Sequence, residues 1–145
     1  MPYLFDTNIW LELLLEQQQA ELVRRLFAVV PAAELAITDF ALHSIGLSFQ
    51  GRWNRPERYK EFLRDMIEET ATVILRLSPA QLKEVIDAAE TYGLDFDDAY
   101  QYMAAQTHGY RLVSFDRDFT RTPEGAEHPD AVIAVKTTEE RDAAE

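Results

Sequence analysis

Aspartates stand beside short apolar runs at three widely separated places in this sequence. Asp6 follows the apolar run at 3–5, a second group of aspartates lies within 95–98, and Asp116 follows the apolar run at 112–115. Carboxylate oxygens are the ligands that Mg²⁺ and Mn²⁺ prefer, whereas clustered carboxylates without a cation repel one another. The pattern therefore predicts a divalent-cation site that is formed by segments far apart in the chain.

Each of these aspartates also has a purely structural explanation. Asp6 is a suitable N-cap for a helix, Asp98 complements the positive end of a helix, and Asp116 can cap a short turn. Taken singly, each residue leaves both interpretations open. The three together favour a common site.

Strands that alternate with helices must position these side chains. Apolar runs predict short strands, with turn residues between them, at 3–5, 34–37, 72–75, 111–114 and 131–135. Apolar periodicity and capping residues predict helices after residue 6 and over about 38–50, 56–69, 79–91 and 96–107. Such alternation indicates an α/β domain with a mainly parallel sheet, in which ligands bind beyond the carboxyl ends of the strands.

Length and composition limit the function classes. The 145 residues, 47% of them hydrophobic, are enough for one domain, which we place at 1–135, followed by a charged tail at 136–145 that we expect to be partly disordered. The net charge of −12 opposes general attraction to nucleic acid, so a nucleic-acid substrate needs a local basic patch or a bound metal. Cysteine is absent, which excludes thiolate sites. With no signal peptide and no membrane-spanning apolar run, we expect a cytoplasmic protein.

Three segments together resemble the PIN domain family, metal-dependent ribonucleases that include the toxins of VapBC-type toxin–antitoxin systems. The matching segments are 5–8 (Phe-Asp-Thr-Asn), 95–101 and 112–119. The resemblance implies a three-layer α/β/α fold with a central, mainly parallel sheet of four to five strands. It also implies an endoribonuclease, the toxin of a type II system, that uses Mg²⁺ or Mn²⁺.

Carried over to this chain, the resemblance makes Asp6, Asp98 and Asp116 the metal-binding and catalytic residues. Asp95 and Asp118 are further candidates. The implied partners are RNA, a cognate antitoxin and a second copy of the chain.

Neighbouring polar residues are candidates for supporting roles. Thr7 and Asn8 can orient a carboxylate or contact phosphate, or they can simply cap the helix. Arg117 and Arg121 lie close to Asp116 in sequence and are candidates for binding substrate phosphate. A basic stretch at 52–64 with interleaved aromatic residues suits RNA, but pairing with its own acidic residues explains it equally simply.

The resemblance breaks at one place. PIN domains usually carry a fourth acidic residue on the helix after the second strand, and the matching position here is Ser44, with His43 beside it. Asp39 lies in the first turn of that helix, too early to take the same direction. Ser44 can act through water, Asp95, Asp97 or His43 can be recruited, or activity can be lost.

Two other functions therefore stay open. One is a degenerate PIN-like domain that binds RNA or a protein without cleaving. The other is an acidic receiver domain that accepts phosphate on aspartate, although no matching acceptor aspartate and late lysine are found. Apolar residues on the first two helices form either the core or a surface for a second copy or an antitoxin: Leu11, Leu14, Leu15, Leu22 and Val23.

Overall fold

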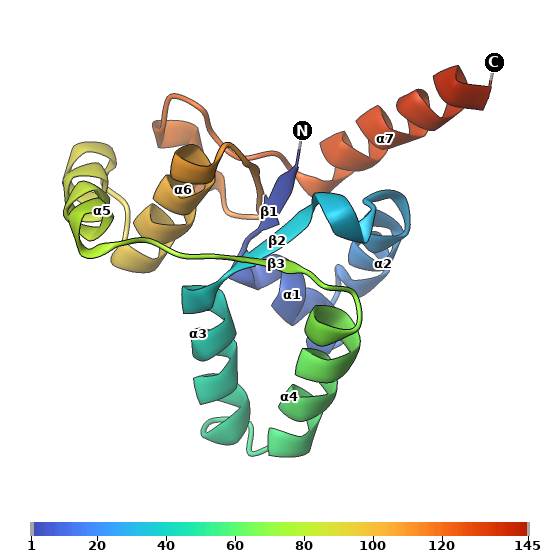
Figure 1. Ribbon diagram of the computed structural model, residues 1–145, viewed down its shortest axis with the longest axis horizontal. Coiled ribbons are helices and arrows are strands. Elements are labelled where there is room, and N and C mark those ends of the chain that lie inside the picture. The colour runs from blue at the N-terminus through green and yellow to red at the C-terminus, as the bar shows by residue number, and fades with distance from the viewer. Residues whose placement is uncertain (1, 145) are drawn as a thin grey trace.

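A computed structural model describes residues 2–144 of the chain (Figure 1). Met1 and Glu145, the outer limits of the predicted domain and tail, lie outside the described residues. Within the described residues no helix is long and apolar enough to cross a membrane.

The centre of the molecule is a four-stranded sheet in the order β3-β2-β1-β4. All neighbouring strands are parallel, with Leu4 opposite Leu112 and Ile37 opposite Ile74. The strands are short: β1 (Tyr3–Phe5), β2 (Leu35–Thr38), β3 (Val73–Leu75) and β4 (Arg111–Val113). The predicted parallel α/β sheet is confirmed, and it has four strands within residues 2–144.

Helices follow every strand. On the first half of the chain these are α1 (Thr7–Leu14), α2 (Ala20–Val29), the 3₁₀ turn η1 (Ala32–Glu34), α3 (Asp39–Gln50) and α4 (Pro56–Phe62), which widens into the π-helical segment η2 (Leu63–Glu68). The second half contains α5 (Pro79–Tyr92), α6 (Phe96–His108), the 3₁₀ turn η3 (Arg117–Arg121) and α7 (Pro129–Ala144).

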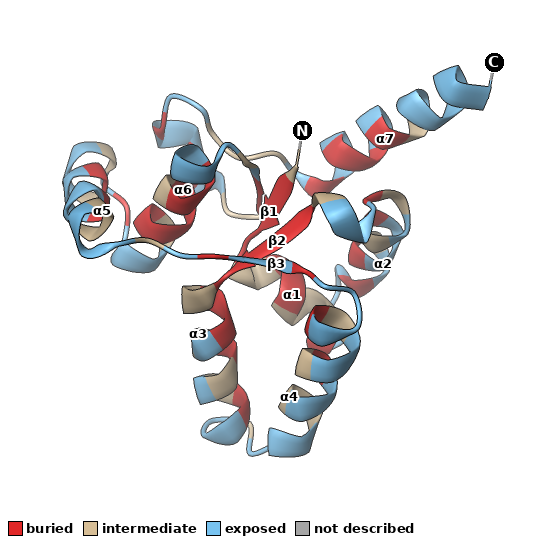
Figure 2. Cartoon of the chain, viewed as in Figure 1, coloured by how far each residue is buried: buried red, intermediate tan, exposed pale blue. Residues whose placement is uncertain are grey.

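Alternation along the strands creates two cores. Tyr3 and Phe5 of β1 belong to one buried cluster with residues of α1, α2, α3 and α7, whereas Leu4 belongs to the other with residues of α5 and α6. Successive strand residues point to opposite faces, so burial of a whole strand requires a layer on each side. The ribbon shows these layers, and α3 and α4 form a pair that projects from the sheet (Figures 1 and 2). The three-layer fold is confirmed.

Local sequence signals set the ends of the helices. Ser78 and Gln81 form a complete capping box at the start of α5. Gly93 ends that helix at φ 65°, a left-handed conformation that glycine adopts without strain. The sequence therefore fixes the turn that leads into Asp95, the N-cap of α6.

The strand predicted at 131–135 is wrong. This segment lies in α7, where Val132, Ile133 and Lys136 are buried at three- and four-residue spacing. The tail predicted to be partly disordered is helical through Ala144. The position beside β4 is taken instead by a single parallel bridge between Val113 and Glu127.

Asn54 and Glu57 have the residue types and spacing of a capping box, which predicts one at the start of α4, but this box does not form. Asn54 has φ 48°, and the N-cap of α4 is Arg55, which makes no side-chain capping bond. The predicted helix over 56–69 is present in position, but its second half has π-helical geometry from Leu63 onward. One periodic apolar pattern over 56–69 therefore contains both α-helical and π-helical geometry.

Candidate metal centre

Asp6 lies at the centre of the polar residues beyond the sheet. It directly follows β1 and is the N-cap of α1, where its Oδ1 accepts a hydrogen bond from the backbone N–H of Thr7 at 2.8 Å. Only 5% of Asp6 is exposed. Burial raises the pKa of its carboxyl, and hydrogen bonds from Ser114 and Gln101 oppose that rise. The carboxyl is thus held in a fixed orientation at a high desolvation cost.

Ser114 links Asp6 to the end of β4. Its hydroxyl donates to Asp6 Oδ2 at 2.7 Å and accepts from the backbone N–H of Asp116 at 3.0 Å. Asn8 Nδ2 donates to the same hydroxyl at 3.1 Å, while Asn8 Oδ1 accepts from the backbone N–H of Phe115. Asn8 therefore positions the β4 end, which supports the orienting role among its predicted alternatives.

Gln101 holds Asp6 from the opposite side. Its Nε2 donates to Asp6 Oδ1 at 3.1 Å, and its Oε1 accepts from the Thr38 hydroxyl at 2.6 Å. Gln101 is 1% exposed and comes from α6, whereas Thr38 ends β2 and caps α3. The Gln101 amide thereby joins α6 to the ends of β1 and β2.

Three aspartates form an oxygen-lined cluster in front of this network. Asp98, Asp116 and Asp118 each offer a carboxylate oxygen, and these oxygens lie within 4.8 Å of one another. Asp98 is in the first turn of α6, and Asp116 is the N-cap of η3, where it accepts from the backbone N–H of Asp118 at 2.8 Å. An all-carboxylate set of this spacing suits Mg²⁺ or Mn²⁺.

Charge repulsion within the cluster is visible at Asp98. Burial, and then the nearby charges of Asp6, Asp116 and Asp97, raise the pKa of Asp98 to about 7. A bound cation would reverse this effect because it favours the ionised carboxylates. The arrangement of charges therefore fits a cation better than it fits four carboxylates alone.

A hollow of about 190 Å³ opens beside these groups. Asp6, Asp98 and Gln101 line it, and so does Ser44 from α3. The remaining lining residues are Thr7, Asn8, Leu11, Phe40 and Asp97. The sequence position that lacks the fourth acidic residue is thus brought to the predicted site.

Other predicted residues lie at the rim or elsewhere. Asp95 lies with Asp97 and Asp98 in a second exposed acidic group. His43 is exposed and lines a separate hollow between α3 and α4, so the structure does not bring it to Asp6. Asp39 accepts hydrogen bonds from the Phe40 backbone and the Tyr100 hydroxyl.

The two candidate arginines differ. Arg121 donates to the carbonyl of Gly93 at 2.6 Å and pairs with Asp118, so it ties η3 to the turn before α6. Arg117 is exposed, and among residues 2–144 it has no ion pair. In the basic stretch, three ion pairs confirm that its charges pair with neighbouring acidic residues: Arg58–Glu61, Lys60–Glu57 and Arg64–Asp65.

The apolar residues of α1 and α2 belong to the core. Leu14 and Val23 are buried in the larger cluster, and Leu11, Leu15 and Leu22 pack against it. Core packing is therefore the confirmed use of this set.

Sequence reasoning missed Gln101 and Ser114 as site residues. Both lie inside the segments that carry the family resemblance, but neither is a residue type that binds metal strongly. A polar residue directly after the apolar strand of β4, and a glutamine three positions after Asp98 on α6, were the available signals.

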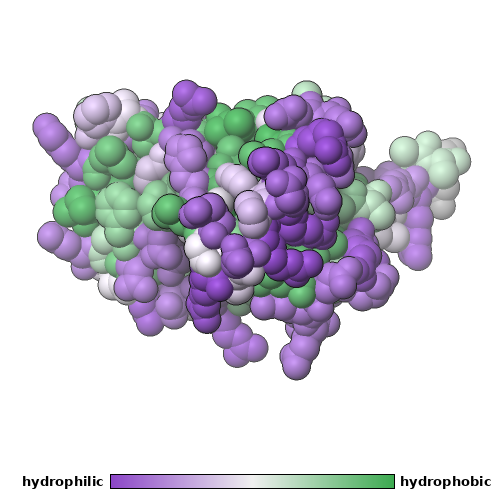
Figure 3. All heavy atoms as spheres, turned by 90° about the horizontal axis from the view of Figure 1, so that it is seen from below, coloured by the Kyte–Doolittle hydropathy of each residue, from purple (hydrophilic) through white to green (hydrophobic). Residues whose placement is uncertain are grey.

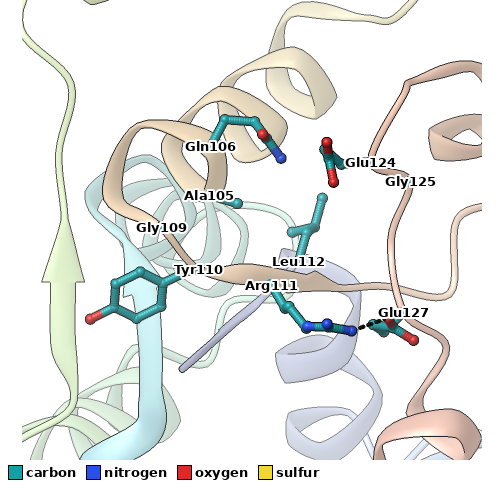
Figure 4. A pocket seen from close by; sticks show the side chains of 9 residues that line it. All are labelled: Ala105, Gln106, Gly109, Tyr110, Arg111, Leu112, Glu124, Gly125 and Glu127. Atoms are coloured by element: carbon teal, nitrogen blue, oxygen red, sulfur yellow. Dashed lines mark hydrogen bonds and ion pairs between the residues drawn. The ribbon is translucent and has the colours of Figure 1, made fainter. Parts of the chain in front are cut away.

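A second polar hollow lies away from the carboxylates. Figure 4 shows it between the end of α6, β4 and the loop at 124–127, with Arg111 reaching Glu127 at 2.7 Å. It has a volume of about 230 Å³ and contains none of the predicted metal ligands. The candidate metal centre is therefore the aspartate cluster, with the smaller hollow beside it.

Comparisons with known proteins agree with this geometry. The family model described as "PIN domain" matches residues 3–125. A search of curated proteins gives no match.

Solved structures show the same fold. A toxin–antitoxin complex from Klebsiella pneumoniae is 24% identical, with a TM-score of 0.67, 88% of this chain covered and 97% of that chain. FitAcB from Neisseria gonorrhoeae is 17% identical, with a TM-score of 0.67 and the same coverage. PAE2754 from Pyrobaculum aerophilum is 20% identical, with a TM-score of 0.66, 95% of this chain covered and 96% of that chain.

Proposed function

The chain belongs to the PIN domain family, and we propose that it is a metal-dependent endoribonuclease, the toxin of a type II toxin–antitoxin system. The observation that carries this proposal is the cluster of Asp98, Asp116 and Asp118 in front of the buried Asp6. A structural capping role explains each aspartate singly, but it does not explain why their charges are concentrated at one edge of the sheet.

Each residue has a role in phosphodiester hydrolysis. Asp98, Asp116 and Asp118 would present oxygens to Mg²⁺ or Mn²⁺, and Asp6, whose charge acts on Asp98, would be the fourth carboxylate near the ion. When bound, such a cation polarises a phosphoryl oxygen and lowers the pKa of a bound water. Ser114 and Gln101 keep the Asp6 carboxyl oriented, since they occupy both of its oxygens. No protein nucleophile is needed.

Substrate phosphate has a cation available at the rim. Arg117 directly follows Asp116 and is exposed, so it can approach a backbone phosphate that bridges to the metal centre. We do not assign phosphate binding to Arg121, because its guanidinium already donates to Gly93 and Asp118. Its role is to position η3.

RNA cleavage tests the proposal. Purified protein should cleave single-stranded RNA with Mn²⁺, and cleavage should stop when EDTA is added. Asp116→Asn should reduce cleavage at least 100-fold. Asp87→Asn, an exposed acid on α5, is the matched control and should cleave like the wild type. Intact RNA after incubation of the wild type with Mn²⁺ and diverse RNAs would refute the enzyme.

Ser44 favours a second candidate function. It occupies the place in the hollow where the usual fourth acidic residue would lie, and no glutamate or aspartate from α3 lines that hollow among the described residues. A domain that binds RNA or a protein partner without cleaving fits this gap. Ser44→Glu separates the nuclease from the degenerate domain. If the wild type is inactive and this variant cleaves RNA with Mn²⁺, the degenerate domain is supported.

A protein partner is part of the toxin proposal. Two of the structural neighbours above are a toxin–antitoxin complex and FitAcB, and this chain has an apolar hollow of about 520 Å³ between α3 and α4. Leu47 at its rim is 75% exposed. Coexpression with the product of an adjoining small reading frame should yield a complex that no longer cleaves RNA. We also propose a homodimer that acts in the cytoplasm.

A further inference from the structure

The carboxyl edge of the sheet continues beyond the metal centre. All four strands are parallel, so the residues that follow β2 and β3 lie at the same edge as Asp6 and Asp116. Phe40 follows β2 and lines the same hollow as Asp6 and Asp98, and Arg76 directly follows β3. An extended ligand that reaches the carboxylates from this side must pass these two residues.

Aromatic rings stand beside the hollow. The Phe40 ring lies 5.2 Å from the Tyr100 ring at 30°, and 6.0 Å from the Phe96 ring at 52°. The Tyr100 hydroxyl donates to Asp39 Oδ1 at 2.6 Å, and the same oxygen accepts from the Phe40 backbone. Phe40 and Tyr100 are therefore held in place.

Phe96 is the open member of this group. It is 42% exposed, although it begins α6 only two residues before Asp98. Exposed aromatic rings are costly in water unless they pack against something, and a ring beside a phosphoryl-transfer site meets a flat apolar partner when a nucleobase is bound. On the side of the molecule where α5 and α6 lie, the surface seen in Figure 3 shows apolar atoms gathered among hydrophilic ones.

Arg76 adds a cation to this edge of the sheet. Its side chain is exposed, and within the part of the chain that is described it forms no ion pair. The next residue, Leu77, packs against the buried cluster that contains Tyr100, so the chain at Arg76 lies beside this cluster. The charge of Arg76 also opposes the burial that raises the pKa of Tyr100 to about 12. The sheet edge thus runs from carboxylates to aromatic rings to an unpaired cation.

We propose that Phe40, Phe96 and Arg76 form a track for an unpaired nucleotide strand, in which the rings stack on a base and Arg76 binds a phosphate. The inference rests on the proposed nuclease function and specifies its substrate, because the bases of a duplex are already stacked and cannot lie on Phe96. The phosphate one or two nucleotides along the strand then reaches the metal centre.

Binding of an oligonucleotide tests the track directly. Fluorescence anisotropy of a labelled single-stranded 12-nucleotide RNA is measured in Ca²⁺, with its integrity checked on a gel. Phe96→Leu keeps an apolar side chain but removes the ring, so binding should weaken about tenfold. Phe96→Tyr keeps an aromatic ring and should bind the RNA like the wild type. Ile86→Ala, which alters an exposed apolar residue on α5, should bind like the wild type.

Salt dependence isolates Arg76. Removing one phosphate contact on a single strand lowers the slope of log K against log salt by about 0.7, so Arg76→Gln should show that change. Arg25→Gln removes the same charge from an exposed position on α2 and should leave the slope unchanged.

The outcomes separate this inference from the nuclease itself. If the wild type cleaves RNA with Mn²⁺ but Phe96→Leu binds as tightly as wild type and Arg76→Gln keeps the slope, the track is refuted and the enzyme stands. If the wild type neither binds nor cleaves RNA, both fail. If Phe96→Leu loses only capture of a coexpressed protein partner, a protein covers the rings and the track is refuted.

Discussion

The hydroxyl of Ser114 donates a hydrogen bond of 2.7 Å to Oδ2 of Asp6, although the two residues are 108 positions apart in the chain. This contact joins the end of β1 to the end of β4, neighbouring strands in the sheet. The same hydroxyl accepts from the backbone of Asp116, so a single serine sets the relative positions of two candidate ligands. The sheet therefore holds the residues of the candidate metal centre in place without a cation.

Ser114→Ala should destabilise the protein and weaken its metal binding. Asp6 is buried, so loss of this donor leaves a carboxyl oxygen without a partner at a cost of about 1–3 kcal/mol. Urea unfolding without metal and a Mn²⁺ titration measure the two effects. Ser48→Ala on α3 is the control, and equal unfolding free energies for both variants would contradict the role of Ser114.

Gln101→Leu should be at least as damaging. It removes one of the donors to Asp6 Oδ1 and the acceptor of the Thr38 hydroxyl proton together, and loss of these two buried hydrogen bonds should cost about 2–4 kcal/mol. Gln106→Leu, on an exposed position of the same helix, should change the unfolding free energy by less than about 0.5 kcal/mol. A wild-type value for Gln101→Leu would show that the network contributes nothing.

Stability without metal should fall as the pH rises. The pKa of Asp98 is about 7 in the folded protein and near 3.8 in the unfolded chain, so the folded state binds more protons between these values. The free energy of unfolding therefore decreases from pH 4 to pH 7, and burial of Asp6 acts in the same direction. Chemical unfolding in EDTA at several pH values measures this slope.

Metal affinity should change in the opposite direction. A cation requires ionised carboxylates, so the affinity for Mn²⁺ should rise with pH until about pH 7 and then level off. Asp98→Asn should flatten part of this dependence and leave the part that is due to Asp6. An affinity that is constant from pH 5.5 to pH 7.5 would exclude proton release by the cluster.

Lys136→Ala should loosen α7. Lys136 is 9% exposed, and its Nζ lies 2.9 Å from both carboxylate oxygens of Glu34 and 5.6 Å from the centre of the Tyr3 ring. Loss of these contacts should cost about 1–3 kcal/mol and should speed amide exchange in α7. Lys83→Ala, at an exposed position on α5, is the control, and unchanged exchange in α7 would refute the anchor.

Contacts with distant residues explain why the strand prediction at 131–135 is wrong. The run Ala131–Val135 is short and rich in β-branched residues, which favours a strand by local pattern alone. In the structure Val132 and Ile133 pack in the larger core, and Lys136 pairs with Glu34, 102 positions away, and no local rule shows these contacts. At Ser78–Gln81, in contrast, the signal is local and complete, and the predicted start of α5 is confirmed.

The candidate site shows the same difference between local sequence signals and distant contacts. Asp98, Asp116 and Asp118 could be found because acidic residues at strand ends and helix starts are visible in the sequence, and the structure brings them together. Gln101 and Ser114 could not be assigned, because their importance lies in contacts made across about a hundred residues. Tertiary contacts, rather than residue types, distinguish positioning residues from ordinary polar ones.

Thermal unfolding against Mn²⁺ concentration tests the central claim most directly. A ligand that binds only the native state at 100 times its Kd stabilises it by about 2.7 kcal/mol, which corresponds to about 5–10 °C in Tm for a chain of this size. The wild type and the exposed-acid control Asp87→Asn should show this rise, and Asp116→Asn should lose most of it. A flat response of the wild type up to millimolar Mn²⁺, or an equal rise in Asp116→Asn, would contradict a metal centre at these aspartates.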